Sequence, residues 1–96
     1  MATGKEYKDY ILEQLGLLDG VSAKPMMGEY LLYFGGKLFG GVYDNRLLVK
    51  MTATNEKFGM EKVVPYANAK PLYMPNYTEN RELLKEIVLE TVNGLK

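Results

Sequence analysis

Residues 24–50, KPMMGEYLLYFGGKLFGGVYDNRLLVK, decide the fold of this 96-residue chain. Runs rich in β-branched and aromatic residues alternate here with short turn dipeptides. Gly35-Gly36 and Asp44-Asn45 are two-residue links of the kind that favours type I′ or II′ hairpin turns. Four extended segments are therefore predicted, at 21–27, 29–34, 37–43 and 46–51. Gly28, between the first two, is expected to mark a bulge or a bend.

A helix is predicted on each side of this region. Residues 5–15 carry apolar side chains near the helical period, with Thr3 as a candidate N-cap. Asn80 can cap a closing helix that ends at Gly94. The apolar stripe of that helix consists of Leu83, Leu84, Ile87, Val88, Thr91 and Val92. A helical turn at 54–58 and two short strands, at 63–66 and 72–77, complete the pattern.

These elements predict one α+β domain over residues 1–96. We expect an antiparallel sheet of about four to six strands, flanked in two layers by the N-terminal and C-terminal helices. Ile11 and the stripe of the closing helix should share a core with one face of the sheet. Counting outward from the two turns places Leu31, Tyr33, Leu38, Val42, Leu47, Val49 and Met51 on that core face.

The opposite face of the predicted sheet is also apolar. It carries Tyr30, Leu32, Phe34, Phe39, Tyr43 and Leu48, with Lys37, Arg46 and Lys50 among them. Leaving such side chains in water forfeits about 1.5–3 kcal/mol each, so something is expected to cover them. The cover is either the segment 65–75 or the N-terminal arm of this chain, or a partner. The predicted partner interface, most simply with a second copy, consists of Tyr30, Leu32, Phe34, Phe39, Tyr43, Leu48 and Lys50.

Two other kinds of function remain open. Aromatic rings interleaved with cations on a sheet can stack the bases of a single-stranded nucleic acid. The residues for that reading are Tyr30, Phe34, Phe39, Lys37, Arg46 and Lys50. A small-ligand domain or an enzyme would instead need a pocket with converging polar groups. The assignments of residues to the two sheet faces depend on the register, because a slip of one residue exchanges the two faces.

Composition argues against several classes of chemistry. The chain has no histidine and no cysteine, which removes the usual zinc ligands and the commonest general base. No phosphate-binding loop motif is present. We therefore predict no enzyme, no catalytic residues, no cofactor and no metal. Twelve Lys and Arg balance twelve Asp and Glu, so this chain alone is expected to bind duplex DNA weakly at most.

The termini and the hydropathy pattern predict a cytoplasmic protein. The polar N-terminus MATGKE does not resemble a secretory signal. No apolar run approaches the roughly 18 residues of a membrane span, so no membrane partner is expected.

Six motifs, taken in order, resemble the TfoX (Sxy) N-terminal domain family. They are PMMGEYLLY from Pro25, GKLF from Gly36, DNRLLVK from Asp44, FGM from Phe58, KPLYMPNY from Lys70 and ELL from Glu82. The resemblance implies an α+β fold and a link to the regulation of competence for DNA uptake. It implies no catalytic residues. The function we expect is therefore a non-enzymatic regulatory domain that acts by protein–protein contact.

The departures from the family pattern concern the first hairpin and the domain organisation. Met27 stands where the family usually has Phe, and Glu29 and Leu31 stand where it has Gly. Leu48 replaces a common Tyr. Longer members carry a second, C-terminal domain associated with regulation, and we expect this chain to lack one because its closing helix ends at Gly94.

Overall fold

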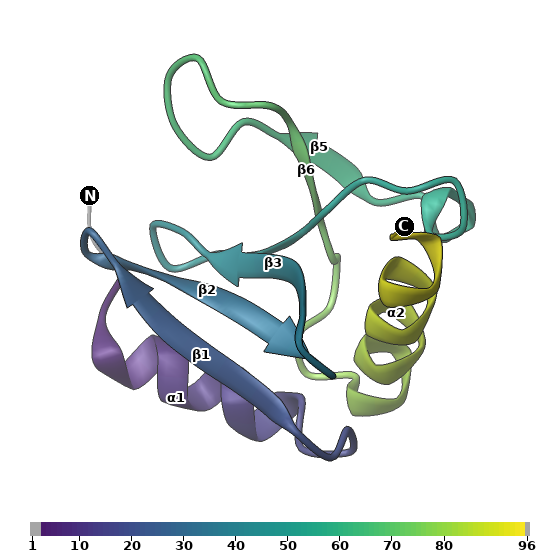
Figure 1. The fold of residues 1–96 in the computed structure, drawn as a ribbon, viewed down its shortest axis with the longest axis horizontal. Coiled ribbons are helices and arrows are strands. Elements are labelled where there is room, and N and C mark those ends of the chain that lie inside the picture. Colours follow the sequence, from purple (N-terminus) through teal and green to yellow (C-terminus); the bar gives the residue numbers. More distant parts are fainter. Residues whose placement is uncertain (1–2, 96) are drawn as a thin grey trace.

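The computed structural model describes residues 3–95 and confirms the α+β class (Figure 1). Two α-helices, a 3-10 turn and six strands follow one another along the chain. They are α1 (Lys5–Gln14), β1 (Val21–Met26), β2 (Glu29–Phe34), β3 (Lys37–Val42), β4 (Leu47–Val49), η1 (Glu56–Phe58), β5 (Glu61–Val63), β6 (Leu72–Met74) and α2 (Arg81–Gly94). The strands form one antiparallel sheet in the order β1-β2-β3-β4-β6-β5.

Local turn chemistry accounts for the first four strands. Gly35 and Gly36 both have positive φ, of 60° and 81°, and Asp44 and Asn45 have φ of 51° and 56°. Positive φ at both central residues is what a type I′ hairpin requires, so both predicted turns are confirmed. Gly28 also lies in a two-residue turn with a positive φ of 86°, as the predicted bend rather than as a bulge.

The bulge lies in β3 instead. Tyr33 pairs with Leu38, as the turn arithmetic predicts, but Leu32 pairs with Gly40. Phe39 therefore has no partner on β2 and is an extra residue in β3. A bulge of this kind shifts the register by one and reverses the direction of the side chains beyond it.

The predicted faces of β2 are consequently wrong. Pairing now aligns Leu32, Gly40 and Val49 across three strands. Leu32 and Phe39 are fully buried in the same cluster as Val42, Leu47 and Val49, whereas Leu31 and Tyr33 lie outside it. The register from β3 to β4 is as predicted, with Val42 opposite Leu47 and Gly40 opposite Val49.

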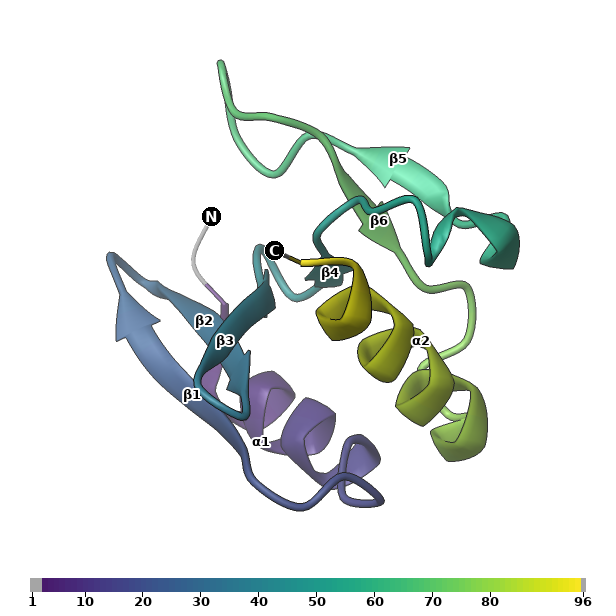
Figure 2. The same cartoon turned by 45° about the vertical axis from the view of Figure 1, so that its right-hand side comes forward.

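Both helices pack on this one face. The core cluster joins residues of α1, of α2 and of the central strands in a single group. Ile11 and Leu15 enter it from the first helix, and Leu84, Ile87 and Val88 enter it from the second. Figures 1 and 2 show α1 beneath β1 and β2 and α2 beside β3 and β4. The predicted contributions of Ile11, Leu84, Ile87 and Val88 are confirmed.

The N-terminal arm is anchored to the β3–β4 turn by polar contacts. Thr3 does not cap α1, whose N-cap is Gly4. The Thr3 hydroxyl donates to Glu29 Oε1 at 2.6 Å, and the Thr3 backbone N–H donates to the same oxygen at 3.0 Å. Asp44 N–H also donates to Glu29 Oε1, at 3.1 Å, so one carboxylate joins the arm, β2 and the turn. These contacts hold the entry to α1 against the sheet.

The bulge gives a direct stability test. We expect Phe39→Ala to lower the free energy of unfolding by about 3–5 kcal/mol, because it empties a fully buried site in the core. Leu38→Ala is the matched control, since Leu38 is half-buried on the other face, and it should cost clearly less. Urea unfolding followed by circular dichroism measures both, and an equal or larger loss from Leu38→Ala would contradict the register.

Candidate functional site

Four of the seven predicted interface residues are buried in the single chain. Leu32, Phe39 and Leu48 are 0% exposed in the single chain, and Tyr43 is 8% exposed. Tyr30 and Phe34 are half-buried and pack against the core cluster. The bulge is the reason, because it turns Leu32 and Phe39 inward. Stacking of bases on Phe39 is therefore excluded, and contact of Tyr30, Phe34 or Lys50 with a partner remains a prediction.

Part of the second sheet face is covered from within the chain, which is the intramolecular alternative. Leu48 lies between two core residues of β4, so its side chain points to the opposite face. It pairs with Gly41, over which the ring of Tyr43 packs so closely that a Cβ would lie 2.8 Å from ring atom Cε2. The ring of Tyr66 lies 6.2 Å from that of Tyr43, centroid to centroid. The loop after β5 thus extends the cover.

A groove lies on this second face, between β4 and the loop that joins β5 to β6. Its volume is about 620 Å³. The lining is mainly apolar and consists of Tyr43, Lys50, Met51, Pro65, Tyr66, Ala69, Lys70, Pro71 and Leu72. Figure 2 shows the loop rising away from both helices, so the groove is on the side of the sheet that the helices leave free.

The loop has a local reason to leave the sheet. Pro65 and Pro71 lack a backbone N–H and so cannot extend the ladder of β5 and β6. Between them, the N–H of Ala69 donates to the carbonyl of Tyr66 at 3.1 Å, and Asn68 has a positive φ of 67°. These constraints hold Tyr66, which is 59% exposed, at the rim of the groove. The predicted strand at 63–66 is wrong except at Val63, because β5 spans Glu61–Val63, and β6 (Leu72–Met74) is shorter than the predicted 72–77.

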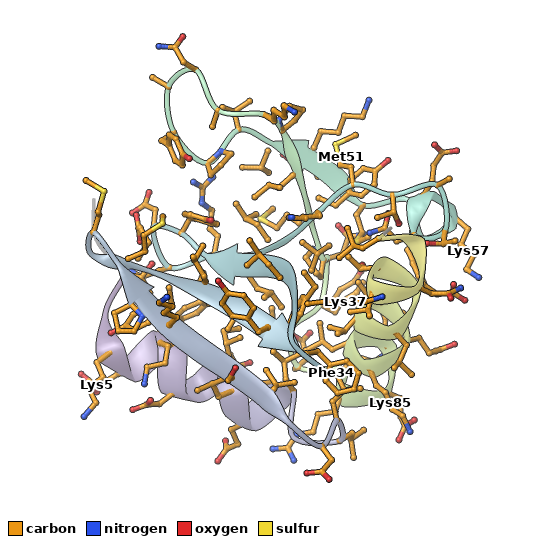
Figure 3. All side chains as sticks on the ribbon, viewed as in Figure 1. Lys5, Phe34, Lys37, Met51, Lys57 and Lys85 are labelled. Atoms are coloured by element: carbon orange, nitrogen blue, oxygen red, sulfur yellow. The ribbon has the colours of Figure 1, made fainter. Side chains whose placement is uncertain are left out.

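Three lysines border this region. Lys50 and Lys70 line the groove, and a smaller hollow beside it is lined by Lys37, Leu38, Lys50 and Leu95. In the view of Figure 3, Lys37 lies near β3, and Met51 lies above it. The ion pairs described for residues 3–95 involve other cations, namely Lys8, Lys57 and Arg81. No Asp or Glu is among the lining residues, so the groove is locally cationic in a chain of zero net charge.

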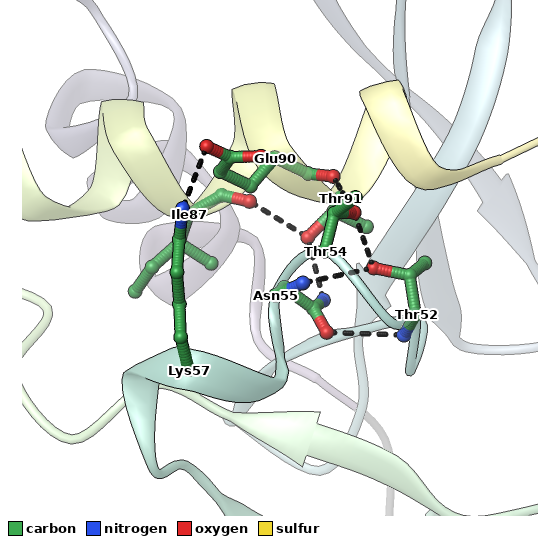
Figure 4. Close-up of polar contacts among 7 residues, drawn as sticks. All are labelled: Thr52, Thr54, Asn55, Lys57, Ile87, Glu90 and Thr91. Atoms are coloured by element: carbon green, nitrogen blue, oxygen red, sulfur yellow. Dashed lines mark hydrogen bonds and ion pairs between the residues drawn. The ribbon is translucent and has the colours of Figure 1, made fainter.

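A buried asparagine fixes the backbone along one side of the groove (Figure 4). Asn55 is 0% exposed. Its Nδ2 donates to the Lys50 carbonyl and to Thr91 Oγ1, both at 2.8 Å, and its Oδ1 accepts from the N–H of Thr52 at 3.0 Å. One side chain thus joins the end of β4, the following loop and α2.

Threonine hydroxyls continue the same network onto the helix. Thr54 donates to the carbonyl of Glu90, and Thr91 donates to the carbonyl of Ile87 at 2.7 Å. Outside this cluster, Lys57 pairs with the Glu90 carboxylate at 2.9 Å. Within residues 3–95 no buried side-chain nitrogen or oxygen lacks a hydrogen-bond partner. All of these groups are satisfied internally, which identifies the cluster as structural support for the groove.

Neither a metal site nor a membrane-spanning helix is found within residues 3–95. Over residues 3–95, no group of three or more acidic residues is arranged to hold a metal ion. None of the helices in this part of the chain is long and apolar enough to cross a membrane. Sequence reasoning missed the groove residues Met51, Tyr66, Ala69, Lys70 and Leu72. The prolines at 65 and 71 are the sequence signal for the four of these residues that come from the loop and β6. Met51, predicted on the core face, is 37% exposed and lines the groove instead.

The elements described above form a small α+β domain, and comparison with known proteins gives its family. The chain matches the TfoX N-terminal domain over residues 13–91 and belongs to that family. It is also 34% identical over 76 residues to an uncharacterised 12.7 kDa protein in the trpE 5′ region of Spirochaeta aurantia. That match covers 77% of this chain and 66% of the relative.

Asn55 provides a test of the support behind the groove. We expect Asn55→Ala to lower the free energy of unfolding by at least about 2 kcal/mol, because it leaves buried partners without a hydrogen bond. Asn93→Ala, on the exposed side of α2, should stay within about 0.5 kcal/mol of the wild type. Equal effects in urea unfolding would show that the network contributes nothing specific.

Tyr43 should make stability depend on alkaline pH. Burial raises the pKa of Tyr43 above its ordinary value of 10.0, and the nearby Tyr66 and Glu29 raise this pKa further. A raised pKa means that the folded state holds this proton more tightly than the unfolded state, so its contribution is complete below pH 10.0 and is lost as pH rises through the folded pKa.

The measurement compares wild type with Tyr43→Phe in urea unfolding at pH 8, 10 and 11. The wild type should lose more stability than the variant between the second and third values, because Phe cannot ionise. Identical losses would contradict the assignment.

Proposed function

We propose that this chain is a non-enzymatic regulatory domain of the cytoplasm that acts by binding another protein through the groove beside Tyr66. Competence for DNA uptake is the regulated process that we propose, and the family resemblance supports it. The single observation that carries the contact is the groove, which is mainly apolar and is supported by a fully satisfied hydrogen-bond network. The absence of cysteine from the sequence fits a reducing compartment.

Exposed apolar side chains near the groove support a protein partner. Met51, Val64 and Tyr66 are 37%, 53% and 59% exposed, and they lie along the groove or directly beside its lining residues. Tyrosine and methionine are enriched where proteins meet, because both offer a large contact area and adapt to a partner. A cluster of such residues around a concave surface favours binding over a purely solvated rim.

The partner is proposed to be a different protein. The sequence predicts self-association because it places large apolar side chains on a sheet face that the helices do not cover. Leu32, Phe39 and Leu48 are buried within the single chain, so these three residues give no reason for a dimer. A homodimer remains a prediction, and light scattering at high micromolar concentration measures it.

Site-specific photo-crosslinking in the native cells tests the contact. A photoreactive phenylalanine analogue replaces Tyr66 in one strain and Leu89 in a matched control. Leu89 is 41% exposed on α2, away from the groove. We expect a discrete protein adduct from position 66 and none from position 89. Adducts of equal yield at both positions, or none at 66, would contradict the proposal.

The regulatory role has a separate measurement. A deletion strain complemented with Tyr66→Ser should keep the altered DNA-uptake frequency of the deletion, whereas Leu89→Ser should restore the wild-type frequency. Full restoration by Tyr66→Ser, with normal protein levels, would remove the regulatory role of this surface.

A further inference from the structure

We propose that the groove and the neighbouring hollow bind an acidic, extended peptide segment of the partner, with an apolar side chain of that segment seated in the groove. This inference rests on the proposed function and names the chemistry of the partner. It depends on three features of the same surface, which are its charge, its lining and the geometry of its aromatic rings.

Charge is the first feature. Lys50 borders both hollows, Lys70 lines one of them and Lys37 lines the other. Within the described residues none of the three forms an ion pair, although lysines elsewhere do so with Asp9 and Glu90. Unpaired cations around a concave surface without carboxylates attract and orient an anionic partner. An acidic segment that crosses from one hollow to the other would meet all three lysines.

The apolar lining is the second feature. Met51, Pro65, Pro71 and Leu72 give the groove an aliphatic character between the lysines. Its volume, about 620 Å³, is in the range of sites that enclose a compact ligand or a bulky side chain. Interfaces typically depend on one or two apolar anchors in such pockets, surrounded by polar contacts. An acidic segment with a Leu or Phe anchor matches this arrangement.

The aromatic geometry favours a peptide over a single-stranded nucleic acid. Sequence-tolerant binding of single strands uses several exposed rings on which successive bases stack. Here Tyr43 is only 8% exposed, and its ring is tilted by 51° to that of Tyr66. Tyr66 alone offers an accessible ring in the groove, and no arginine is among the lining residues.

Fluorescence anisotropy with defined probes tests the inference on the full chain. The main probe is the fluorescein-labelled peptide EDELFDEE. The comparison probes are KKKLFKKK, EDEGSDEE and a twelve-nucleotide oligothymidine. We expect saturable binding of the first peptide, weakened by added salt, and at least about tenfold weaker binding of the other two peptides. Tighter binding of the oligothymidine than of EDELFDEE would overturn the proposal in favour of a nucleic acid.

Two charge-reversal variants localise the site. Lys70→Glu should weaken EDELFDEE binding by about fivefold or more, because it reverses a charge in the groove. Lys5→Glu changes the net charge by the same amount on α1, distant from the groove residue Met51 in Figure 3, and should have a much smaller effect. Equal effects of the two variants would mean that only net charge matters, and would overturn the proposed site.

Amide chemical shifts give a readout that does not depend on affinity. Titration of the ¹⁵N-labelled chain with EDELFDEE should move the resonances of Lys50, Met51, Ala69 and Leu72 and leave those of α1 in place. Shifts confined to other elements would overturn the inference. If EDELFDEE fails to bind while position 66 still crosslinks a protein, the acidic peptide is wrong and the proposed function stands. If the peptide binds in the groove but position 66 gives no adduct, the acidic-peptide site stands and the proposed function fails.

Discussion

The extra residue at Phe39 determines which side chains of β2 and β3 enter the core. Because Phe39 has no partner on β2, the pairing of Leu32 moves to Gly40, and Leu32 and Phe39 both enter the core. The close approach of β3 and β4 at this point requires a glycine, since a Cβ on Gly40 would run into the carbonyl oxygen of Leu48. The bulge thus gives both helices a single apolar face to cover, and neither helix covers the other face.

One part of the second face is closed by the chain itself, and the part beyond it borders the groove. Tyr43 packs over Gly41, and Tyr66 approaches Tyr43 from the loop after β5, so the part nearest the β3–β4 turn is closed. Beyond it, the two prolines carry the loop away from the sheet and a groove remains. The same loop therefore covers one portion of the face and forms the wall of a site over the next.

A buried polar network stabilises this arrangement from the helix side. Asn55 holds the backbone at Lys50 and Thr52 against Thr91 of α2. A buried amide is costly unless its donors and acceptors are paired, and here the surrounding hydroxyls and backbone groups pair them. Gly94 ends the same helix against Thr52 and Thr54, where a Cβ would collide with both side chains. The same network therefore contacts both α2, which packs on the core, and the backbone of Lys50, which lines the groove.

The sequence by itself determined both helices, the first four strands and the family. The hairpins at Gly35-Gly36 and Asp44-Asn45, the apolar stripe of α2 and the ordered motifs of the TfoX N-terminal domain are all short-range signals. Turn residues fix φ locally, and helical periodicity is visible within a few turns, so no tertiary information is needed.

Tertiary structure alone decided which face of β2 is buried and where the groove lies. A β-bulge depends on the fit between neighbouring strands, and one unpaired residue reverses every side chain beyond it. Lys37, Lys50 and Lys70 are far apart in sequence and border one surface only because β3, β4 and the loop before β6 are adjacent in the folded chain. In the sequence, nothing distinguishes Asn55 from an ordinary turn residue. Only the packing of α2 brings Thr91 within hydrogen-bond distance of Asn55.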